Sequence, residues 1–333
     1  MRARTRNLTA ALGLVLGTSV LAVPAGAADT DDSFTSENSP PTIEIVSVSA
    51  LDSNGDQQGD SVWYPTVTDV EVVYTVSDAN TLAGSTSTIC FTNDGVCVAG
   101  MNGFDEAGYF VSEDTNTTAS LAKITSGTWG ATTQSISQLG TWDSTSVTFT
   151  LRVTVGAIAR ATALGGTWSV LAIVDDGSDS DSDISSGHTV ADYVTMSGSI
   201  LDRDFGTIGA GSVSSPISRT LTGIKANTNW DVSVEVVDDK FVDGDVSEAL
   251  PDIALDTDGS PSGYRFSLRC DGTASPTTAG VYVGTSATPV WTDGAPFTSD
   301  VAATQDIGCV IYNGQTPSGR YQGVVRTTLS VGS

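Results

Sequence analysis

Histidine and lysine are almost absent from this sequence. Of its 333 residues, one is histidine (His188) and three are lysine. Serine and cysteine nucleophiles depend on a neighbouring base, most often histidine, and no nucleophile motif lies near His188. The sequence also lacks the GxSxG, HExxH and glycine-rich phosphate-loop patterns. These absences predict a protein that is not an enzyme, although a glycosidase with two carboxylates would leave no such motif among so many acids.

Positive charge is scarce in general. The chain has 39 acidic and 14 basic residues, a formal net charge of -25 and a pI near 4.1. Nucleic acids and anionic lipid surfaces bind proteins through positive charge, so both are poor partners for this chain. Cations suit it better.

Only one apolar run approaches membrane length, and it lies at the N-terminus. Three arginines precede the run Leu8–Val23, and Ala25-Gly26-Ala27 follows it. This order is typical of a secretory signal peptide spanning residues 1–27. Its removal takes away three arginines and no acid, which changes the formal charge from -25 to -28. We therefore expect a secreted, extracellular or cell-surface protein with no transmembrane anchor in the mature chain.

Alternating apolar and polar residues predict β-strands after the signal peptide. In Val147–Val155 the residues Val, Phe, Leu, Val and Val alternate with threonines and an arginine, which indicates a half-buried strand. Asp69–Val76 and Trp230–Val237 show the same period. Trp168 and Trp230 lie in alternating strands, so we expect both in the core. A strand with one apolar face needs a second sheet to cover it. We expect an all-β protein.

The chain length suits two domains. Residues 28–40 are polar and acidic with one aromatic, Phe34, and are typical of a flexible tail. The run Ser178–Ser186 is also polar and acidic, and predicts a linker. We therefore expect two tandem β-sandwich domains, at 41–186 and 187–333, with irregular loops and minor strands over 100–141.

The first half resembles the immunoglobulin-like modules of prokaryotic extracellular surface proteins. Three features carry the resemblance: the opening Pro40-Pro41-Thr42-Ile43, the strand end Val76-Ser77-Asp78, and the closing Gly166-Thr167-Trp168 strand that runs into Asp and Gly. The resemblance covers roughly residues 40 to 180. It implies Ig-like, Greek-key sandwiches in a surface or stalk context and brings no catalytic residues. The ending GRYQGVVRTTLSV is similar to the last strand of many fimbrial and surface-protein sandwiches.

Four cysteines allow three pairings. Secretion makes disulfides chemically reasonable, and two domains leave an even pair in each half. We expect Cys90 to pair with Cys97, across a hairpin turning at Asn93-Asp94-Gly95, and Cys270 to pair with Cys309. A zinc site is disfavoured because the pairs lack CxxC spacing.

The segment from Asp52 to Asp60 is the best metal candidate. Its side-chain oxygens alternate as a calcium loop requires, and the candidate ligands are Asp52, Asn54, Asp56 and Asp60. The fit is incomplete, because Gln57 and Trp63 occupy the places where an EF-hand loop has Gly and Glu. A solvated, turn-rich loop is the alternative. No motif requires a cofactor, and Ca²⁺ is the one ion that the sequence suggests. A second acidic group fits a charged linker better than a cation site; its members are Asp175, Asp176, Asp179, Asp181 and Asp183.

Tryptophans in loops offer flat faces for sugar rings. Trp129, Trp142 and Trp291 lie beside glycine, threonine and aspartate and are the expected exposed ones. Two functions remain open: a non-enzymatic structural or adhesive cell-surface component, such as a surface-layer or filament subunit that self-associates or binds a surface polymer or protein, and a carbohydrate-binding or glycan-active protein.

Overall fold

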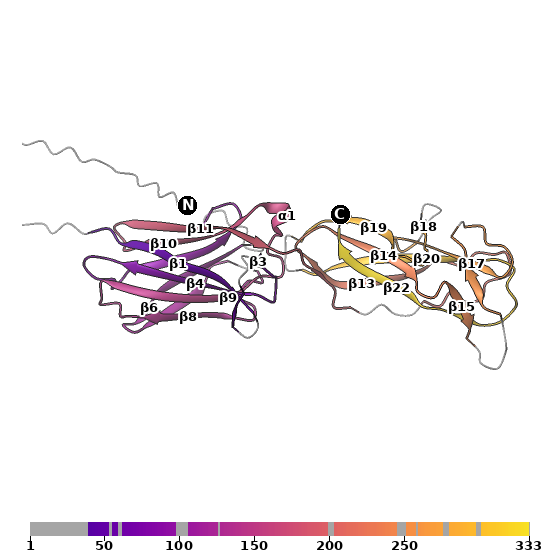
Figure 1. The fold of residues 1–333 in the computed structure, drawn as a ribbon, viewed down its shortest axis with the longest axis horizontal. Helices are drawn as coiled ribbons and strands as arrows, with labels where there is room; N and C mark the ends of the chain where they lie inside the picture. Colours follow the sequence, from indigo (N-terminus) through magenta and orange to yellow (C-terminus); the bar gives the residue numbers. More distant parts are fainter. Residues whose placement is uncertain are drawn as a thin grey trace, which may run out of the picture. The chain divides into compact units, whose positions relative to one another are not determined.

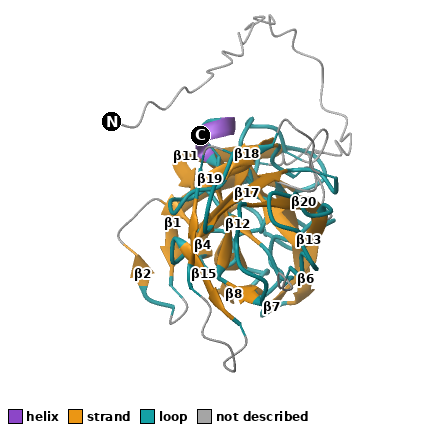
Figure 2. Ribbon diagram, turned by 90° about the vertical axis from the view of Figure 1, so that its right-hand side faces the viewer, coloured by secondary structure: helices purple, strands orange, loops and turns teal. Residues whose placement is uncertain are grey.

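The computed structural model describes residues 39–52, 55–58, 62–97, 106–125, 127–198, 203–244, 251–257, 259–275, 280–297 and 301–332. Its secondary structure is β apart from one short helix, α1 (Thr162–Gly165), as Figure 2 shows by colour. The predicted all-β fold class is confirmed. In the described part of the chain, no helix has the length and apolar character needed to cross a membrane.

Two sheets make up the N-terminal half, and Figure 1 shows β1, β4 and β9 side by side. The first sheet has the order β2-β1-β4-β9-β8. Its strands are β1 (Thr42–Leu51), β2 (Gln57–Gln58), β4 (Asp69–Ser77), β8 (Gln134–Leu139) and β9 (Ser146–Thr154). The second sheet has the order β3-β11-β10-β5-β6-β7. Its strands are β3 (Val62–Trp63), β5 (Thr86–Thr92), β6 (Ala107–Thr115), β7 (Thr118–Lys123), β10 (Trp168–Asp175) and β11 (Ser180–Val190).

Two further sheets make up the C-terminal half. The third sheet runs β12-β13-β20-β17-β16-β15-β21, with β18 also paired to β17, and the fourth runs β19-β14-β22. The strands of the third sheet are β12 (Val194–Thr195), β13 (Ile217–Ala226), β15 (Lys240–Asp243), β16 (Ile253–Leu255), β17 (Arg265–Asp271), β18 (Val281–Tyr282), β20 (Ala303–Asn313) and β21 (Tyr321–Gln322). Those of the fourth are β14 (Trp230–Val236), β19 (Thr288–Gly294) and β22 (Val325–Val331).

The alternating pattern in the sequence decides which side chains are buried. In β9 the apolar residues Val147, Phe149, Leu151 and Val153 are buried, and the residues between them face outward or are half-buried. β4 and β14 show the same alternation. The strands predicted from this period are therefore confirmed, because a period of two places every second side chain on one face of a sheet.

The buried apolar side chains form two separate clusters, one in each half. The first cluster takes residues from Ile43 to Val190, and the second takes residues from Leu221 to Ile311. Trp168 and Trp230 are both buried, as predicted. The division into two domains stays a prediction.

Two segments are more regular than predicted. The stretch 100–141 contains β6, β7 and β8 where we expected irregular loops and minor strands, because serine and threonine between short apolar pieces still alternate correctly for a sheet. Ser178–Ser186 was predicted to be a linker, and that is wrong. Most of it lies in β11, which pairs with β10. The predicted boundary at 186/187 therefore falls within a strand whose last residue, Val190, belongs to the first cluster.

The side chain of Asn227 forms hydrogen bonds with the chain between β11 and β12. Its side-chain NH₂ donates to the carbonyls of Ala159 and Ala191, at 2.7 and 2.9 Å. Its side-chain carbonyl accepts from the N–H of Tyr193 at 2.7 Å. Asn227 is almost completely buried, so these bonds satisfy a polar side chain that would otherwise be costly to bury.

Candidate interaction surface

Aspartates close the gap between the edges of the first and second sheets. β1 and β11 lie next to each other but belong to different sheets. The N–H of Ile43 donates to Oδ2 of Asp181 at 3.1 Å, and the N–H of Ile45 donates to Oδ2 of Asp183 at 2.8 Å. Carboxylates thus take the place of the strand carbonyls that an extended sheet would supply.

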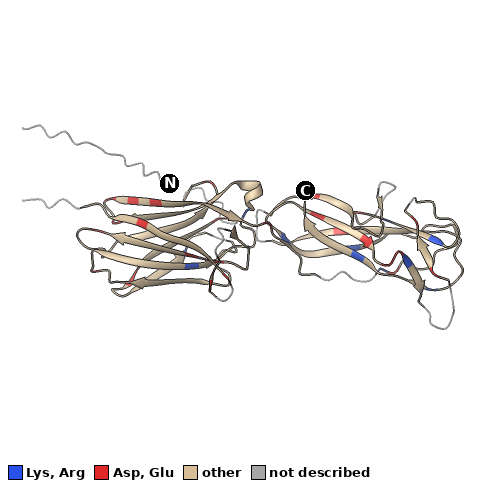
Figure 3. Cartoon of the chain, viewed as in Figure 1, with Lys and Arg blue, Asp and Glu red and all other residues tan. Residues whose placement is uncertain are grey.

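The Ser-Asp alternation explains this placement. Asp181 and Asp183 are two residues apart on β11, so both point to the same side of the strand. The next residue, Ile184, points outward and is 52% exposed. Figure 3 shows the acidic positions of β11 in red. An edge strand with unpaired N–H groups is a template for pairing with another chain, and here those of Ile43 and Ile45 are already bonded.

A groove remains open between β12 and β22 in the C-terminal half. It encloses about 320 Å³ and is lined by Val194, Thr195 and Met196 on one side and by the β22 residues 326–329 on the other. β22 pairs with β14 along one edge. Among the strands that the structure describes, none pairs with its other edge. The groove is therefore bounded by a strand edge that has main-chain groups to offer.

One buried polar atom without a partner lies on the wall of this groove. Oγ1 of Thr327, on the groove wall, is buried and accepts or donates no hydrogen bond within the described chain. Arg203 does not line the groove, but its Nε and Nη2 are also buried without a partner in the described chain. Burial lowers the pKa of Arg203, and the positive charge of Arg219 lowers it further. Such groups are stabilised when an acceptor reaches them.

Basic residues gather around the same strands. Arg326 lines the groove and forms an ion pair with Glu235 at 2.6 Å. Lys225 lies opposite Thr195 in the β12–β13 pair, and Arg219 is on β13. Figure 3 shows blue positions on β13 and β22. Together with Arg203, these make four of the 11 basic residues that follow the predicted signal peptide. Acidic residues lie among them, since Glu235 pairs with Arg326 and Asp306 is opposite Thr220 of β13.

Gly223 lets the chain before the groove run close to β13. The N–H of Gly198 donates to the carbonyl of Thr222 at 3.1 Å, and that of Ser197 to the carbonyl of Gly223 at 3.3 Å. Gly223 has a φ of 67°, and a Cβ there would clash with Oγ of Ser197. A side chain at this position would therefore displace the groove wall.

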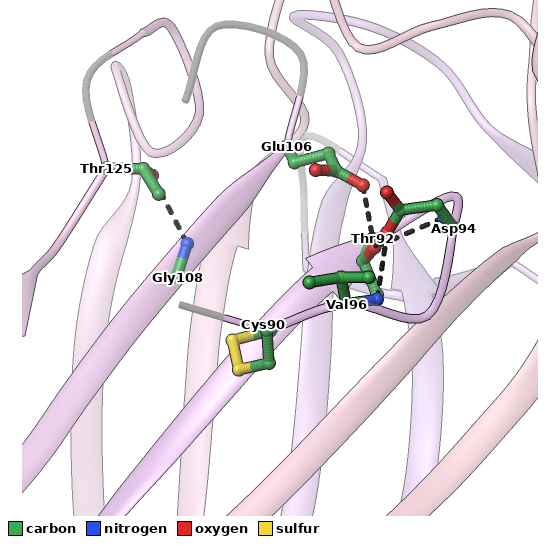
Figure 4. The surroundings of a disulfide bond; sticks show 8 residues. Cys90, Thr92, Asp94, Val96, Glu106, Gly108 and Thr125 are labelled. Atoms are coloured by element: carbon green, nitrogen blue, oxygen red, sulfur yellow. Dashed lines mark hydrogen bonds between the residues drawn. A yellow bond between two sulfur atoms is a disulfide. The ribbon is translucent and has the colours of Figure 1, made fainter. Parts of the chain in front are cut away.

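The first disulfide holds a loop against β5. Cys90 and Cys97 are bonded as predicted, and Figure 4 shows their surroundings. The hairpin expected between them is absent, because β5 pairs with β6 and Cys97 follows the turn without joining a strand. Buried Glu106 fixes this turn by accepting from the hydroxyl of Thr92 at 2.6 Å and the N–H of Asn93 at 2.9 Å.

The second disulfide joins two strands of the third sheet. Cys270 on β17 lies directly opposite Cys309 on β20, and the two are bonded as predicted. Both are fully buried in the second cluster. This bond therefore crosslinks the interior of the C-terminal half, whereas the first ties down a loop.

Only part of the predicted calcium loop lies among the residues that the structure describes. Asn54 and Asp60 lie outside the described residues, and Oδ1 of Asp52 accepts from the N–H of Asp56 at 3.0 Å. That bond is typical of a turn closed by an aspartate. Within the described chain no group of three or more metal-binding side chains comes together. Calcium binding at this loop stays a prediction.

Two of the three tryptophans that were predicted to be exposed are buried, so the prediction is wrong for these two. Trp129 and Trp142 are each 1% exposed, because Trp129 packs among Trp63, Phe91 and Trp168 and Trp142 packs on a core aromatic. Polar residues next to a tryptophan in the sequence do not predict that its side chain is exposed, because distant strands can cover it. Trp291 remains half-buried against Trp230, with ring centroids 4.3 Å apart.

His188 is held in the core. Its ring stacks on Trp63 at 4.8 Å, and desolvation by burial lowers its pKa. Nε2 lies 3.2 Å from Oγ of Ser185. These residues are three apart on β11 and meet because Gly187, with φ 92°, forms a bulge where the register with β10 shifts. His188 is therefore a buried residue of β11 with no nucleophile motif beside it.

Sequence reasoning did not find the groove. Its residues are ordinary strand residues, and it arises because β12 and β22, more than a hundred residues apart, belong to different sheets. The one available signal was the uneven distribution of arginine and lysine, since four of the few basic residues fall within 203–225 and the last strand.

Comparisons with known proteins assign no family. No family model matches the chain, and no curated protein matches it. A solved chaperone–tip adhesin complex of CFA/I fimbriae biogenesis aligns with a TM-score of 0.31 and 10% identity, over 83% of this chain and 98% of that one. The CupB6 tip adhesin from Pseudomonas aeruginosa aligns with a TM-score of 0.24 and 12% identity, over 88% and 95%. TM-scores this low identify neither a fold family nor a function.

Proposed function

We propose that this protein is a non-enzymatic, extracellular component of a cell surface, where it acts as a structural or adhesive subunit that associates with other polypeptide chains. The observation that carries the proposal is the groove beside the unpaired edge of β22. A free strand edge binds an extended polypeptide through main-chain hydrogen bonds, and neighbouring pockets select its side chains.

The contrast with β1 supports this use of β22. The edge N–H groups of Ile43 and Ile45 are bonded to aspartates, so this edge of β1 is protected against strand addition.

The carbohydrate-binding alternative has less support. Trp129 and Trp142 are enclosed by other aromatic side chains, and a buried indole offers no face to a sugar ring. Trp291 is the one candidate that keeps partial exposure. We therefore make glycan binding an outcome of the test.

Negative-stain electron microscopy tests the proposal. The chain from Ala28 onward, which is the form expected after signal cleavage, is imaged with calcium and with a chelator. We expect filaments, sheets or discrete oligomers, and their loss in chelator would make calcium part of assembly. Dispersed particles in both conditions, with binding to a glycan array that is lost on Trp291→Ala, would replace the proposal by the alternative.

A further inference from the structure

The outward side of the second sheet carries a patch of apolar side chains. Its strands bury their inward residues in the first cluster, and residues that are directly paired across strands lie on the same side of a sheet. Of the outward side chains, Ile184 is 52% exposed and Phe110 is 36% exposed. We call this patch the apolar face; its members are Ile173, Phe110 and Ala122 in one row across the strands and Ile184 and Leu171 in the next.

The first disulfide borders the apolar face. Cys90 is paired with Leu171 across β5 and β10, and it stands between Ile89 and Phe91, which belong to the first cluster. Its side chain therefore points outward, yet it has no exposed surface, because the bonded loop lies over it (Figure 4). Val96 of that loop is 39% exposed. The crosslink thus adds an apolar border to the face.

The outward side of the first sheet is different. It is rich in hydroxyls, and those of Thr75 and Thr148 bond to each other at 2.9 Å. It also carries the ion pair between Arg152 and Glu71, at 2.7 Å. Such polar side chains are well solvated, whereas neighbouring apolar side chains that remain exposed mark a protein contact. Of the two outward sides in the N-terminal half, that of the second sheet is therefore the one suited to a partner.

The apolar face carries no charge. Its first row is completed by Ser182 and Thr88. The acids of β11, Asp181 and Asp183, point to the opposite side of the strand and accept from backbone N–H groups of β1. At the end of β10, the carboxylate of Asp175 accepts from an N–H of the turn that follows it, at 2.6 Å. The face is thus neutral, with hydroxyls that can hydrogen-bond without charge.

This neutrality favours a second copy of the chain as the partner. Without the signal peptide the formal charge is -28, so two copies repel each other wherever their acids meet. At the apolar face they can touch without bringing carboxylates together. A charged partner finds no charge to pair with there. Two copies related by a two-fold axis present the same apolar centre and the same hydroxyls to each other.

We propose that the apolar face binds the apolar face of a second copy in a two-fold contact, with Phe110, Ile173 and Ile184 buried at its centre. The inference rests on the proposed function and adds a contact that is separate from the edge of β22. A two-fold contact closes on itself and gives dimers, whereas a further contact through β22 links dimers into larger assemblies.

Opposite charges placed on the apolar face test this contact. One double variant carries F110E and I184E, and the other carries F110K and I184K. Both side chains are exposed, so a charge at either position stays solvated in the single copy. Leu139 on β8 is 77% exposed and lies in the first sheet. L139E and L139K are therefore the matched controls.

Sedimentation velocity of the chain from Ala28 onward reports the outcome. We expect the wild type and the Leu139 variants to associate alike, and each double variant to need at least about a tenfold higher concentration for the same association. An equimolar mixture of the two double variants should recover association, because glutamates of one copy then face lysines of the other. Equal association in every variant and in the mixture would overturn the inference and leave the proposed function standing.

Footprinting locates the contact without any substitution. Hydroxyl-radical oxidation of Phe110 should fall as the protein concentration rises, while that of Tyr264, which is 55% exposed in the C-terminal half, stays constant. Association should strengthen from about 50 to about 500 mM salt, because salt screens the repulsion between acidic copies. Association without protection of Phe110 overturns the inference alone. A chain that stays monomeric at every concentration overturns both the inference and the assembly expected from the proposed function.

Discussion

In the N-terminal half, the backbone N–H groups at the start of β1 are bonded to aspartates of β11. In the C-terminal half, the unpaired edge of β22 borders an open groove. Both halves are built from two sheets with a buried apolar cluster. They differ in what lies beside the edge, which is a pair of aspartates on β11 in the first case and an open groove in the second. The start of β1 is thus closed to strand addition, whereas the outer edge of β22 is open to it.

Removing the disulfides should have the largest effect and should be unequal between the halves. In the chain-entropy model, loops of 39 and 7 residues give about 4 and about 2.5 kcal/mol respectively. We expect C270A/C309A to lower the free energy of unfolding more than C90A/C97A does, as measured by urea denaturation. An equal or reversed loss would show that the buried crosslink does not hold the C-terminal half together.

The double substitution D181A/D183A should open the edge of β1. Two partly buried N–H groups lose their acceptors, which costs about 1 to 3 kcal/mol in total. We also expect concentration-dependent association through β1, measured by sedimentation velocity. D179A is the matched control, because Asp179 is an exposed residue of the same acidic run. If D181A/D183A and D179A behave alike, the aspartates do not protect the edge.

Gly223→Ala should damage the groove wall without touching β22. Alanine is strained at a φ of 67° and meets Oγ of Ser197, so we expect a loss of about 1 to 2 kcal/mol. The segment before β13 should move, and a higher protein concentration should be needed for association, as measured by sedimentation velocity. Gly206→Ala is the comparison, because Gly206 also has a positive φ but a Cβ there meets no atom within 4 Å. Equal association of the two variants would place the contact between copies elsewhere.

The smallest expected effect is a pH dependence confined to the N-terminal half. Because burial lowers the pKa of His188 in the folded state, the unfolded chain binds its proton first as the pH falls. The stability that neutral His188 contributes is therefore complete above about pH 6.5 and is lost as the pH falls below that value. H188Q should flatten this part of the curve, measured as the free energy of unfolding against pH. An unchanged slope would mean that carboxylates alone set the acid sensitivity.

The predictable part of the structure is the part that local pattern determines. Period-two alternation in β4, β9 and β14 specifies which face is buried, and the cysteine distribution suggests the disulfide pairs. The acidic run in β11 was mistaken for a linker because its alternation is between serine and aspartate, and its partner is the backbone of β1, more than a hundred residues away. The burial of Trp129 and the position of the groove depend equally on contacts between distant strands, which one sequence does not display.

Amide hydrogen exchange on the chain from Ala28 onward, at low and at high protein concentration, tests the difference between the two edges most directly. We predict that the amides of Ile43 and Ile45 are protected at both concentrations, because aspartates already bond them. The amides of β22 that face the groove should exchange rapidly at low concentration and become protected as the protein associates. Protection of β22 that does not change with concentration, or new protection appearing at β1 instead, would contradict the account.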